Sequence, residues 1–197
     1  MTMPKPSRRA FVLGFGAAVT VSLIGIAGGA EPPGNSVYQL RLPLTDQDGQ
    51  AFDLASGRGQ PVLVSMFYTS CRMTCPMIIS TIQQTVRALA PADRERMRVL
   101  MISFDPARDT VAALKRTAEE RGCDTHWTLA RTDEASTRKI AAVLGVQYRR
   151  LADGDFSHSS IISLLDADGR IAARSGVVGS VDPDLVQALR RQLMVHH

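Results

Sequence analysis

The stretch from residue 61 to residue 90 decides the fold. It reads PVLVSMF (61–67), YTSCRMTCP (68–76) and MIISTIQQTVRALA (77–90). The first part is short and apolar, which is typical of a central strand covered on both faces. The last part carries apolar residues at helical spacing. Two of the chain's three cysteines, Cys71 and Cys75, are therefore predicted to lie at a strand-to-helix turn.

Pro76 indicates where this helix begins, because proline is tolerated in the first turn of a helix but not in its interior. We therefore expect Cys75 at the helix start and Cys71 in the preceding loop. The helix dipole stabilises a thiolate at this end, so a lowered pKa is predicted for Cys75. Thiolates attack disulfides and bind soft metals. The alternative is that both cysteines are small buried apolar residues, but two within five residues beside a proline make this the weaker interpretation.

The remaining patterns predict one α/β domain over residues 37–195. A second apolar strand, 98–104, completes a βαβ unit with a parallel strand pair. Strands 37–44 and 52–54 form an N-terminal β-hairpin. The later predicted elements are helix 111–121, strand 127–130, helix 133–144, a brief strand at 146–148, a hairpin of 160–165 with 170–173, and helix 182–193. The predicted architecture is a mixed central sheet flanked by helices.

Residues 1–30 have the layout of an export signal, and 31–36 read as a linker. A basic start precedes the uncharged segment 11–30, and Ser7–Leu13 resembles a twin-arginine signal. About 20 apolar residues can also span a bilayer, so a retained membrane anchor at 11–30 is the alternative to cleavage. We expect an exported, periplasmic protein, a location in which disulfides persist.

The positive charge of the chain belongs mostly to this segment. The whole chain has 23 basic and 19 acidic residues. Without Lys5, Arg8 and Arg9, which no acidic residue accompanies within 1–30, 20 basic residues remain against 19 acidic ones. The predicted domain thus offers no electrostatic reason to expect nucleic acid or an acidic membrane surface as a partner.

Several isolated polar residues have ordinary interpretations. Asp109 and Thr110 are expected to cap the helix that follows, and Cys123 is expected to be a packed thiol near a helix end. His126 and the terminal His196 and His197 are expected to be exposed. Met73 and Met77 bring thioether sulfur near the two cysteines, but we expect them to pack at the core or its rim.

Two further residues carry a stronger expectation. Asp105 would lie at the carboxyl end of a parallel strand, the edge at which open α/β sheets place their sites. His158, read locally, is a surface or hydrogen-bonded histidine. If His158 met Cys71 and Cys75, two thiolates and one imidazole would form a soft, low-coordinate set. Such a set suits copper, since structural zinc normally takes four protein ligands.

Three motifs together resemble the SCO/SenC family of thioredoxin-fold copper proteins, which help to assemble the binuclear copper centre of cytochrome c oxidase. They are FYTSC followed by CP (67–76), SFDPARDT (103–110), and HS ahead of LLDADG (158–169). The resemblance covers about 37–193 and implies a thioredoxin-like fold with Cys71, Cys75 and His158 as copper ligands and Asp105 as a supporting group. Residues 72–74 lack the acidic residue often found between the family's cysteines, and the loop before His158 is short.

The resemblance implies a copper metallochaperone rather than an enzyme. Its partners would be an exported copper enzyme, such as a cytochrome c oxidase subunit, and another copper chaperone or a thiol reductant. The alternative is a thiol-disulfide oxidoreductase with Cys71 and Cys75 as its redox pair. His158 discriminates between the two, because dithiol exchange does not need it. A peroxiredoxin-type peroxidase is disfavoured, since Tyr68 and Arg72 stand where Thr or Ser would precede the reactive cysteine, and a purely structural role is the weakest reading.

Overall fold

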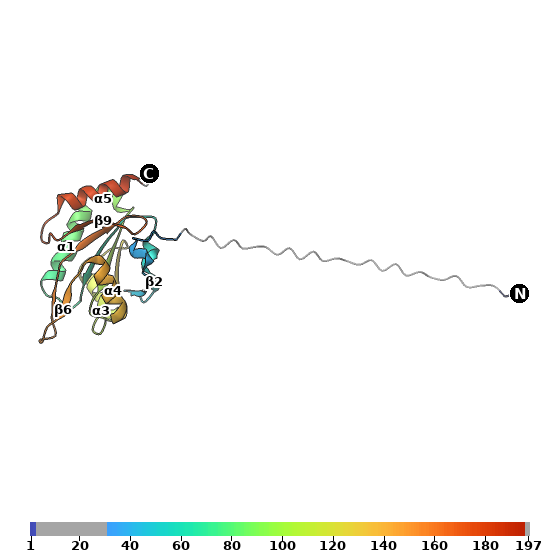
Figure 1. Ribbon diagram of the computed structural model, residues 1–197, viewed down its shortest axis with the longest axis horizontal. Coiled ribbons are helices and arrows are strands. Elements are labelled where there is room, and N and C mark those ends of the chain that lie inside the picture. The colour runs from blue at the N-terminus through green and yellow to red at the C-terminus, as the bar shows by residue number, and fades with distance from the viewer. Residues whose placement is uncertain (3–30, 196–197) are drawn as a thin grey trace. The chain divides into compact units, whose positions relative to one another are not determined.

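The computed structural model describes residues 1–2 and 31–195 (Figure 1). The predicted export signal or anchor, and the pair His196 and His197, lie outside the described residues. Residues Glu31–His197 form one compact unit, and the predicted domain, 37–195, lies within it. Within the part of the chain that the structure describes, no helix has the length and apolar character needed to cross a bilayer.

A seven-stranded sheet in the order β2-β1-β5-β4-β3-β8-β9 forms the centre of this unit. Its strands are β1 (Pro43–Asp46), β2 (Ala51–Asp53), β3 (Val62–Phe67), β4 (Arg98–Ser103), β5 (Trp127–Arg131), β8 (Ile162–Leu165) and β9 (Ile171–Ser175). The three central strands, β3, β4 and β5, run parallel, and the outer pairs are antiparallel. The predicted mixed sheet, its βαβ unit and both hairpins are confirmed.

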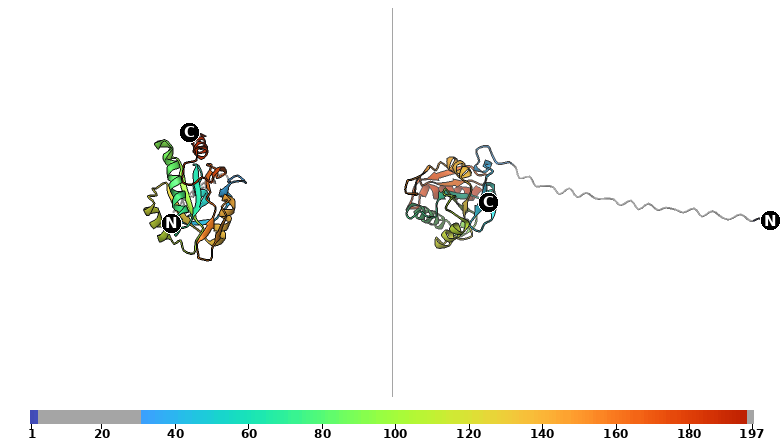
Figure 2. Two further views of the ribbon diagram at one scale, coloured as in Figure 1. Left: turned by 90° about the vertical axis from the view of Figure 1, so that its left-hand side faces the viewer. Right: turned by 90° about the horizontal axis from the view of Figure 1, so that it is seen from below.

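The helices cover both faces of this sheet. They are α1 (Thr74–Arg87), α2 (Pro91–Arg94), α3 (Val111–Glu120), α4 (Glu134–Leu144) and α5 (Pro183–Val195). In both views of Figure 2, α1 and α3 lie on one side of the sheet and α4 lies on the other. The right-handed crossover between parallel strands places α1 and α3 on a common face. Helix α5 packs against β8 and β9, and its Arg190 donates a hydrogen bond to the Ala88 carbonyl at the end of α1.

Burial explains why β3 and α1 hold the site firmly. Every residue of β3 is buried, as expected for a central strand covered on both faces. Ile78 and Ile82, one turn apart on α1, are fully buried in the same hydrophobic core. Truncating either to alanine removes about 2–5 kcal/mol of stability in typical cores. The turn between β3 and α1 is therefore anchored at both of its ends.

Two parts of the fold differ from the sequence prediction. Residues 37–44 were predicted to be one strand, but Val37–Gln39 form the 3-10 helix η1 and β1 begins only at Pro43. The Ser36 side chain caps this helix by accepting from the Tyr38 amide, and Val37 N–H donates to the Gly169 carbonyl. A second short 3-10 helix, η2 (Leu54–Gly57), follows β2. Hydrogen bonds to the β8–β9 turn thus override the alternating pattern.

The second difference is a separate two-stranded sheet, β6 (Tyr148–Arg150) with β7 (Phe156–His158). The brief strand predicted at 146–148 is displaced toward 148–150, and its partner strand was not predicted. The turn between them contains Gly154 with a φ of 84°, a conformation that favours glycine. This hairpin is important because its last residue is His158.

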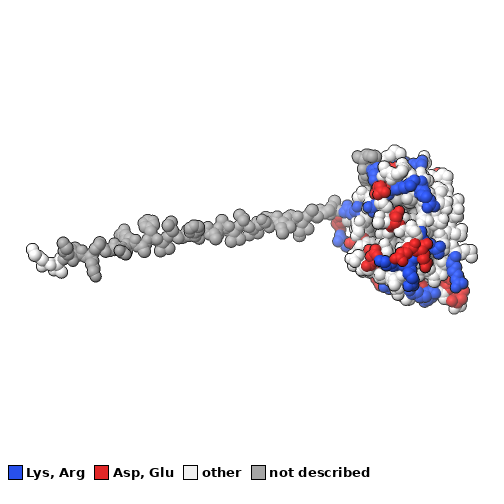
Figure 3. Space-filling view, turned by 180° about the vertical axis from the view of Figure 1, so that it is seen from behind, with Lys and Arg blue, Asp and Glu red and all other residues white. Residues whose placement is uncertain are grey.

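Acidic and basic side chains are intermixed on the face of the domain shown in Figure 3. Among the described residues, exposed ion pairs include Lys115 with Asp48 at 2.9 Å and Arg170 with Asp168 at 3.3 Å. Exposed pairs of this kind contribute little to stability because water and salt screen them. The mixture of signs on this face agrees with the near-equal totals of acidic and basic residues outside 1–30.

Candidate metal centre

The turn between β3 and α1 positions both cysteines as the sequence predicts. Cys71 lies in the loop, where its amide donates to the Tyr68 carbonyl. Cys75 is the second residue of α1, and Pro76 stands in the first turn. Both thiols are free and buried, with Cys71 9% and Cys75 2% exposed. The site therefore begins with two sulfurs that are largely screened from solvent.

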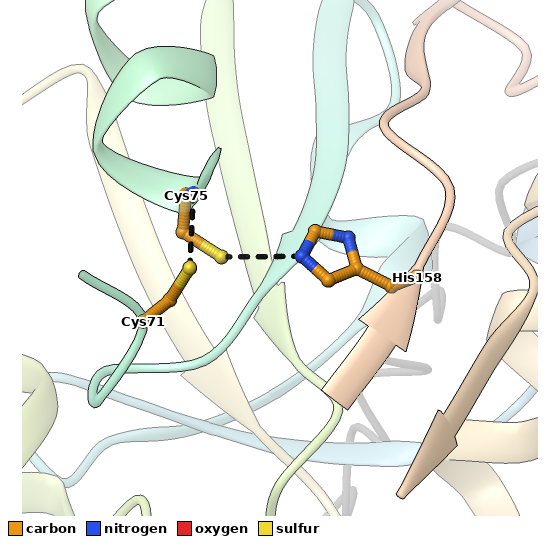
Figure 4. Close-up of side chains that lie close together, drawn as sticks. All are labelled: Cys71, Cys75 and His158. Carbon is orange, nitrogen blue, oxygen red and sulfur yellow. Dashed lines mark hydrogen bonds between the residues drawn. The ribbon is translucent and has the colours of Figure 1, made fainter. Parts of the chain in front are cut away.

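The β6–β7 hairpin brings His158 to the cysteines (Figure 4). The His158 Nε2 atom lies 3.9 Å from the Cys75 sulfur, although the two residues are 83 positions apart. The other ring nitrogen, Nδ1, lies 3.2 Å from the Ser159 carbonyl oxygen. When Nδ1 carries the proton and donates to this carbonyl, Nε2 presents its lone pair to a metal, which is the usual arrangement of a metal-binding histidine.

The ligand atoms of Cys71, Cys75 and His158 all lie within 4.8 Å of one another. Bonds from zinc to sulfur and nitrogen are about 2.3 and 2.0 Å, so two such bonds span about 4 Å across an ion. The donors are therefore spaced to share one metal ion of similar size. Two thiolates and one imidazole are soft ligands, and a set of three matches copper(I) better than structural zinc.

The helix N-terminus acts on Cys71 rather than on Cys75. Burial alone would raise the pKa of Cys71, but hydrogen bonding to its sulfur, mainly by the Cys75 and Met73 amides, outweighs burial and lowers that pKa. The Cys75 amide lies 3.2 Å from the Cys71 sulfur (Figure 4). Free amides at a helix start point out of its end, toward the loop residue.

The lowered pKa predicted for Cys75 is therefore wrong. Burial raises the pKa of the Cys75 thiol well above its ordinary value, although a hydrogen bond at the Tyr68 backbone opposes this effect. The negative charges of Cys71 and Asp109 raise it further. Of the two thiols, Cys71 therefore ionises at lower pH than Cys75 in the metal-free protein.

Aromatic side chains hold the hairpin that carries His158 against the sheet. The rings of Phe104 and His158 have centroids 5.1 Å apart, and Tyr68 meets His158 edge to face at 6.0 Å. Phe156, on β7, contacts both Tyr68 and Phe104 at 5.2 Å. The Tyr68 hydroxyl also donates to the Asp155 carboxylate in the hairpin turn. This cluster was not singled out from the sequence, although its members lie within three residues of Cys71, Asp105 and His158.

Asp109 has a different role from the predicted helix cap. It is fully buried and accepts three hydrogen bonds, from Thr69 N–H at 3.0 Å, Thr69 Oγ1 at 2.6 Å and Ser103 Oγ at 2.5 Å. It thereby ties the loop before Cys71 to the end of β4. The capping prediction for Asp109 is wrong, whereas Thr110 is confirmed as the cap of α3, accepting from the Ala113 amide.

Asp105 is buried beside this network, where its carboxylate pairs with the Arg108 side chain and its amide donates to Ser103 Oγ. The guanidinium of Arg108 in turn lies over the Phe156 ring, 5.6 Å from its centroid. Asp105 is therefore linked to the β6–β7 hairpin indirectly, because its partner Arg108 contacts Phe156 on β7. Its support of the metal ligands stays a prediction.

The remaining candidates lie apart from this cluster or at its rim. Cys123 packs against the core, and burial together with Asp124 raises its pKa to about 11. His126 was predicted to be exposed but is half-buried, with its ring nitrogens 3.1 Å from Glu95 and 2.9 Å from Arg98. Met73 and Met77 were predicted to pack, but their exposed fractions are 74% and 43%.

Comparisons with known proteins agree with this geometry. The SCO1/SenC family model matches residues 31–193. The mitochondrial SCO2 homologue of Mus musculus is 30% identical over 166 residues, which cover 82% of this chain and 65% of that protein. The chain spans 65% of the length of the first curated relatives that it matches.

Solved structures show the same fold. Copper-bound ScoI of Bradyrhizobium japonicum has a TM-score of 0.64 and 29% identity, covering 77% of this chain and 96% of that one. A SCO1/SenC family lipoprotein from Bacillus anthracis has a TM-score of 0.68 and 19% identity, covering 76% and 91%. The fold is thioredoxin-like, as predicted. From the family match over residues 31–193 and the three motifs around the cluster, the chain belongs to the SCO1/SenC family.

Proposed function

We propose that this protein is a copper metallochaperone that binds copper through Cys71, Cys75 and His158 and passes it to a copper enzyme. The observation that carries the proposal is the convergence of two sulfurs and one imidazole nitrogen within 4.8 Å of one another. The copper-bound structure of the 29% identical ScoI supports copper as the metal. Copper is the cargo, so the site must both hold the ion and give it up.

Three protein ligands suit this task. Soft sulfur ligands select copper(I), and a low coordination number leaves room for a partner's ligand to approach. Delivery proceeds by ligand exchange, in which a partner thiolate replaces one ligand of this site at a time. His158, on a short hairpin at the edge of the site, is half-buried, whereas Cys75 is 2% exposed. We infer that His158 leaves the ion first and Cys75 last.

The proposed client is an exported copper enzyme such as a cytochrome c oxidase subunit. One structural neighbour, with 20% identity, is described as a member of the Sco family of cytochrome c oxidase assembly proteins. Export to the periplasm through residues 1–30, as a signal or as an anchor, is part of the same proposal. It is supported by the basic start and the uncharged segment 11–30.

A second candidate function is thiol-disulfide exchange, which the unequal pKa values of the two cysteines favour. The Cys71 thiolate would attack a client disulfide and release one client thiolate. Cys75, after losing its proton, would then attack the Cys71 sulfur of the mixed disulfide. The client leaves as a dithiol, this protein keeps the Cys71–Cys75 disulfide, and an external thiol reductant must restore it. Such a reaction would prepare client cysteines for copper.

Copper stoichiometry tests the proposal. The protein, with His196 and His197 replaced by alanine throughout, should bind one copper(I) ion, and Cys71→Ser, Cys75→Ser and His158→Ala should each lose tight binding. Cys123→Ser and His126→Ala are matched controls, since both residues lie outside the cluster, and they should bind as the parent does. Unchanged tight binding in His158→Ala, with dithiol exchange intact, would favour the second function.

A further inference from the structure

Two exposed methionines stand at the edge of the copper site. Among the described residues, the large apolar side chains that are exposed are Met1, Met73, Met77, Val143, Val177, Met194 and Val195. Met73 directly precedes α1, and the Met77 amide lies 3.4 Å from the Met73 carbonyl oxygen. Residues four apart on a helix share one face, with Cβ atoms about 5–6 Å apart. The two side chains therefore leave the backbone about one helical turn apart, at the exposed start of α1.

This pair is tied directly to the buried ligands. Met73 lies between Cys71 and Cys75 in the sequence, and Cys75 lies between Met73 and Met77 at the start of α1. The Met77 methyl group lies 3.5 Å from the position of a Cβ built on Gly179, so it rests against that glycine at one end. Both methionines are thus exposed, and each lies within two residues of a buried cysteine ligand.

Burial does not explain this placement, because an exposed apolar side chain gains little from the hydrophobic effect. The ability of thioether sulfur to bind a soft metal ion gives a functional reason for it instead. Thioether sulfur is a soft ligand that prefers copper(I), and it carries no proton that must leave before it binds. A neutral thioether also holds the ion less tightly than a thiolate does. Two such ligands suit transient binding of the ion rather than its storage.

Resting on the proposed function and extending it, we propose that Met73 and Met77 form an outer copper(I) position through which the ion enters and leaves the inner site. On entry, the two thioethers replace the ligands of a copper donor, and Cys71 then replaces one thioether. Each step breaks one bond from copper to its ligand and forms another, with copper(I) throughout. Because the thiolates bind more tightly, the equilibrium favours the inner site.

The outer position can be tested without the inner one. Silver(I) is a redox-inert probe with the same ligand preference, and 13C-labelled methionine methyl groups report its binding by NMR. In the Cys71→Ser/Cys75→Ser variant, silver(I) should shift the methyl signals of Met73 and Met77 together and saturably. Met194, which is 67% exposed, is the matched control and should not respond over the same range. Met73→Leu should abolish the response of Met77, and Met77→Leu that of Met73.

A kinetic test uses the full protein loaded with copper(I). Met73→Leu/Met77→Leu should release copper to a chelator several-fold more slowly than the parent while its stoichiometry stays the same, and Met194→Leu should behave as the parent does. Methyl signals that move no more than that of Met194, or that move singly, would overturn the outer position, even if the inner site binds one copper. Failure of the inner site to bind copper would instead refute the proposed function and leave the silver(I) result standing.

Discussion

The backbone amide of Cys75 donates a hydrogen bond to the sulfur of Cys71 over 3.2 Å. The first turn of α1 therefore stabilises negative charge on the loop cysteine, while the cysteine inside the helix lies buried against the core. Although the two thiols are only four residues apart, the pKa of Cys71 is lowered and the pKa of Cys75 is raised. The hydrogen bond also places the Cys71 sulfur at the N-terminal end of α1.

Alkylation of the metal-free, reduced protein should follow this difference. Cys71, with a lowered pKa, should react with iodoacetamide fastest at pH 7, and Cys75 and Cys123 slowly, because burial raises their pKa values. The thiolate of Cys123, with a pKa of about 11, becomes populated only as pH rises toward that value, so its rate should still increase between pH 8 and about 10. Peptide mass spectrometry assigns each site. Faster labelling of Cys75 than of Cys71 would contradict the assignment.

Removing the Tyr68 hydroxyl should weaken copper binding without removing a ligand. Tyr68→Phe loses the hydrogen bond to Asp155 that holds the hairpin of His158. We expect a several-fold lower affinity for copper(I) in competition with a chromophoric chelator, at unchanged stoichiometry. Tyr38→Phe is the matched control, since the buried Tyr38 hydroxyl has no hydrogen-bond partner among the described residues. Equal affinities for the two variants would show that this bond does not position His158.

Asp109 should prove to be a structural residue. Asp109→Ala leaves the two donors of the half-buried Thr69 and the hydroxyl of the buried Ser103 without this acceptor. Each unsatisfied buried donor costs about 1–3 kcal/mol, so the variant should lose about 2 kcal/mol or more in urea unfolding. Thr110→Ala, the neighbouring cap of α3, should lose only about 1 kcal/mol. A loss for Asp109→Ala no larger than that for Thr110→Ala would show that the network is weak.

Copper removal should be reversible and should affect the hairpin more than the sheet. His158 lies on the separate β6–β7 sheet, whereas Cys71 and Cys75 are anchored by β3 and α1. Amide hydrogen exchange in the hairpin should therefore slow on copper(I) binding, with little change in β3 and β4. Slowing of similar size throughout the sheet would indicate a change in global stability instead.

Local sequence patterns predicted the sheet and the cysteine turn because these depend on short-range physics. Apolar runs mark β3 and β4, and Pro76 limits where α1 begins. The position of His158 depends on a hairpin that meets the cysteine turn from 83 residues away, and no local pattern encodes that distance. The proximity of His158 to the two cysteines was predicted only from the resemblance of the motifs to those of a known family.

The wrong predictions share a physical cause. Asp109 was predicted to cap the helix, but its carboxylate instead accepts hydrogen bonds from Thr69, which is distant in sequence from the helix start, and from Ser103, which lies on β4. Cys75 was placed correctly at the helix start, yet its backbone amide donates to the Cys71 sulfur, and burial raises the pKa of its own thiol. Side-chain direction and long-range hydrogen bonds are not visible in spacing alone.

X-ray absorption of the copper(I)-loaded protein tests the central claim most directly, because it reports the atoms bound to the ion. The geometry predicts two sulfur ligands and one nitrogen ligand in the parent, and loss of the nitrogen in His158→Ala but not in His126→Ala. A parent spectrum with sulfur ligands only, or a nitrogen ligand that persists in His158→Ala, would contradict the assignment of His158 as the third ligand.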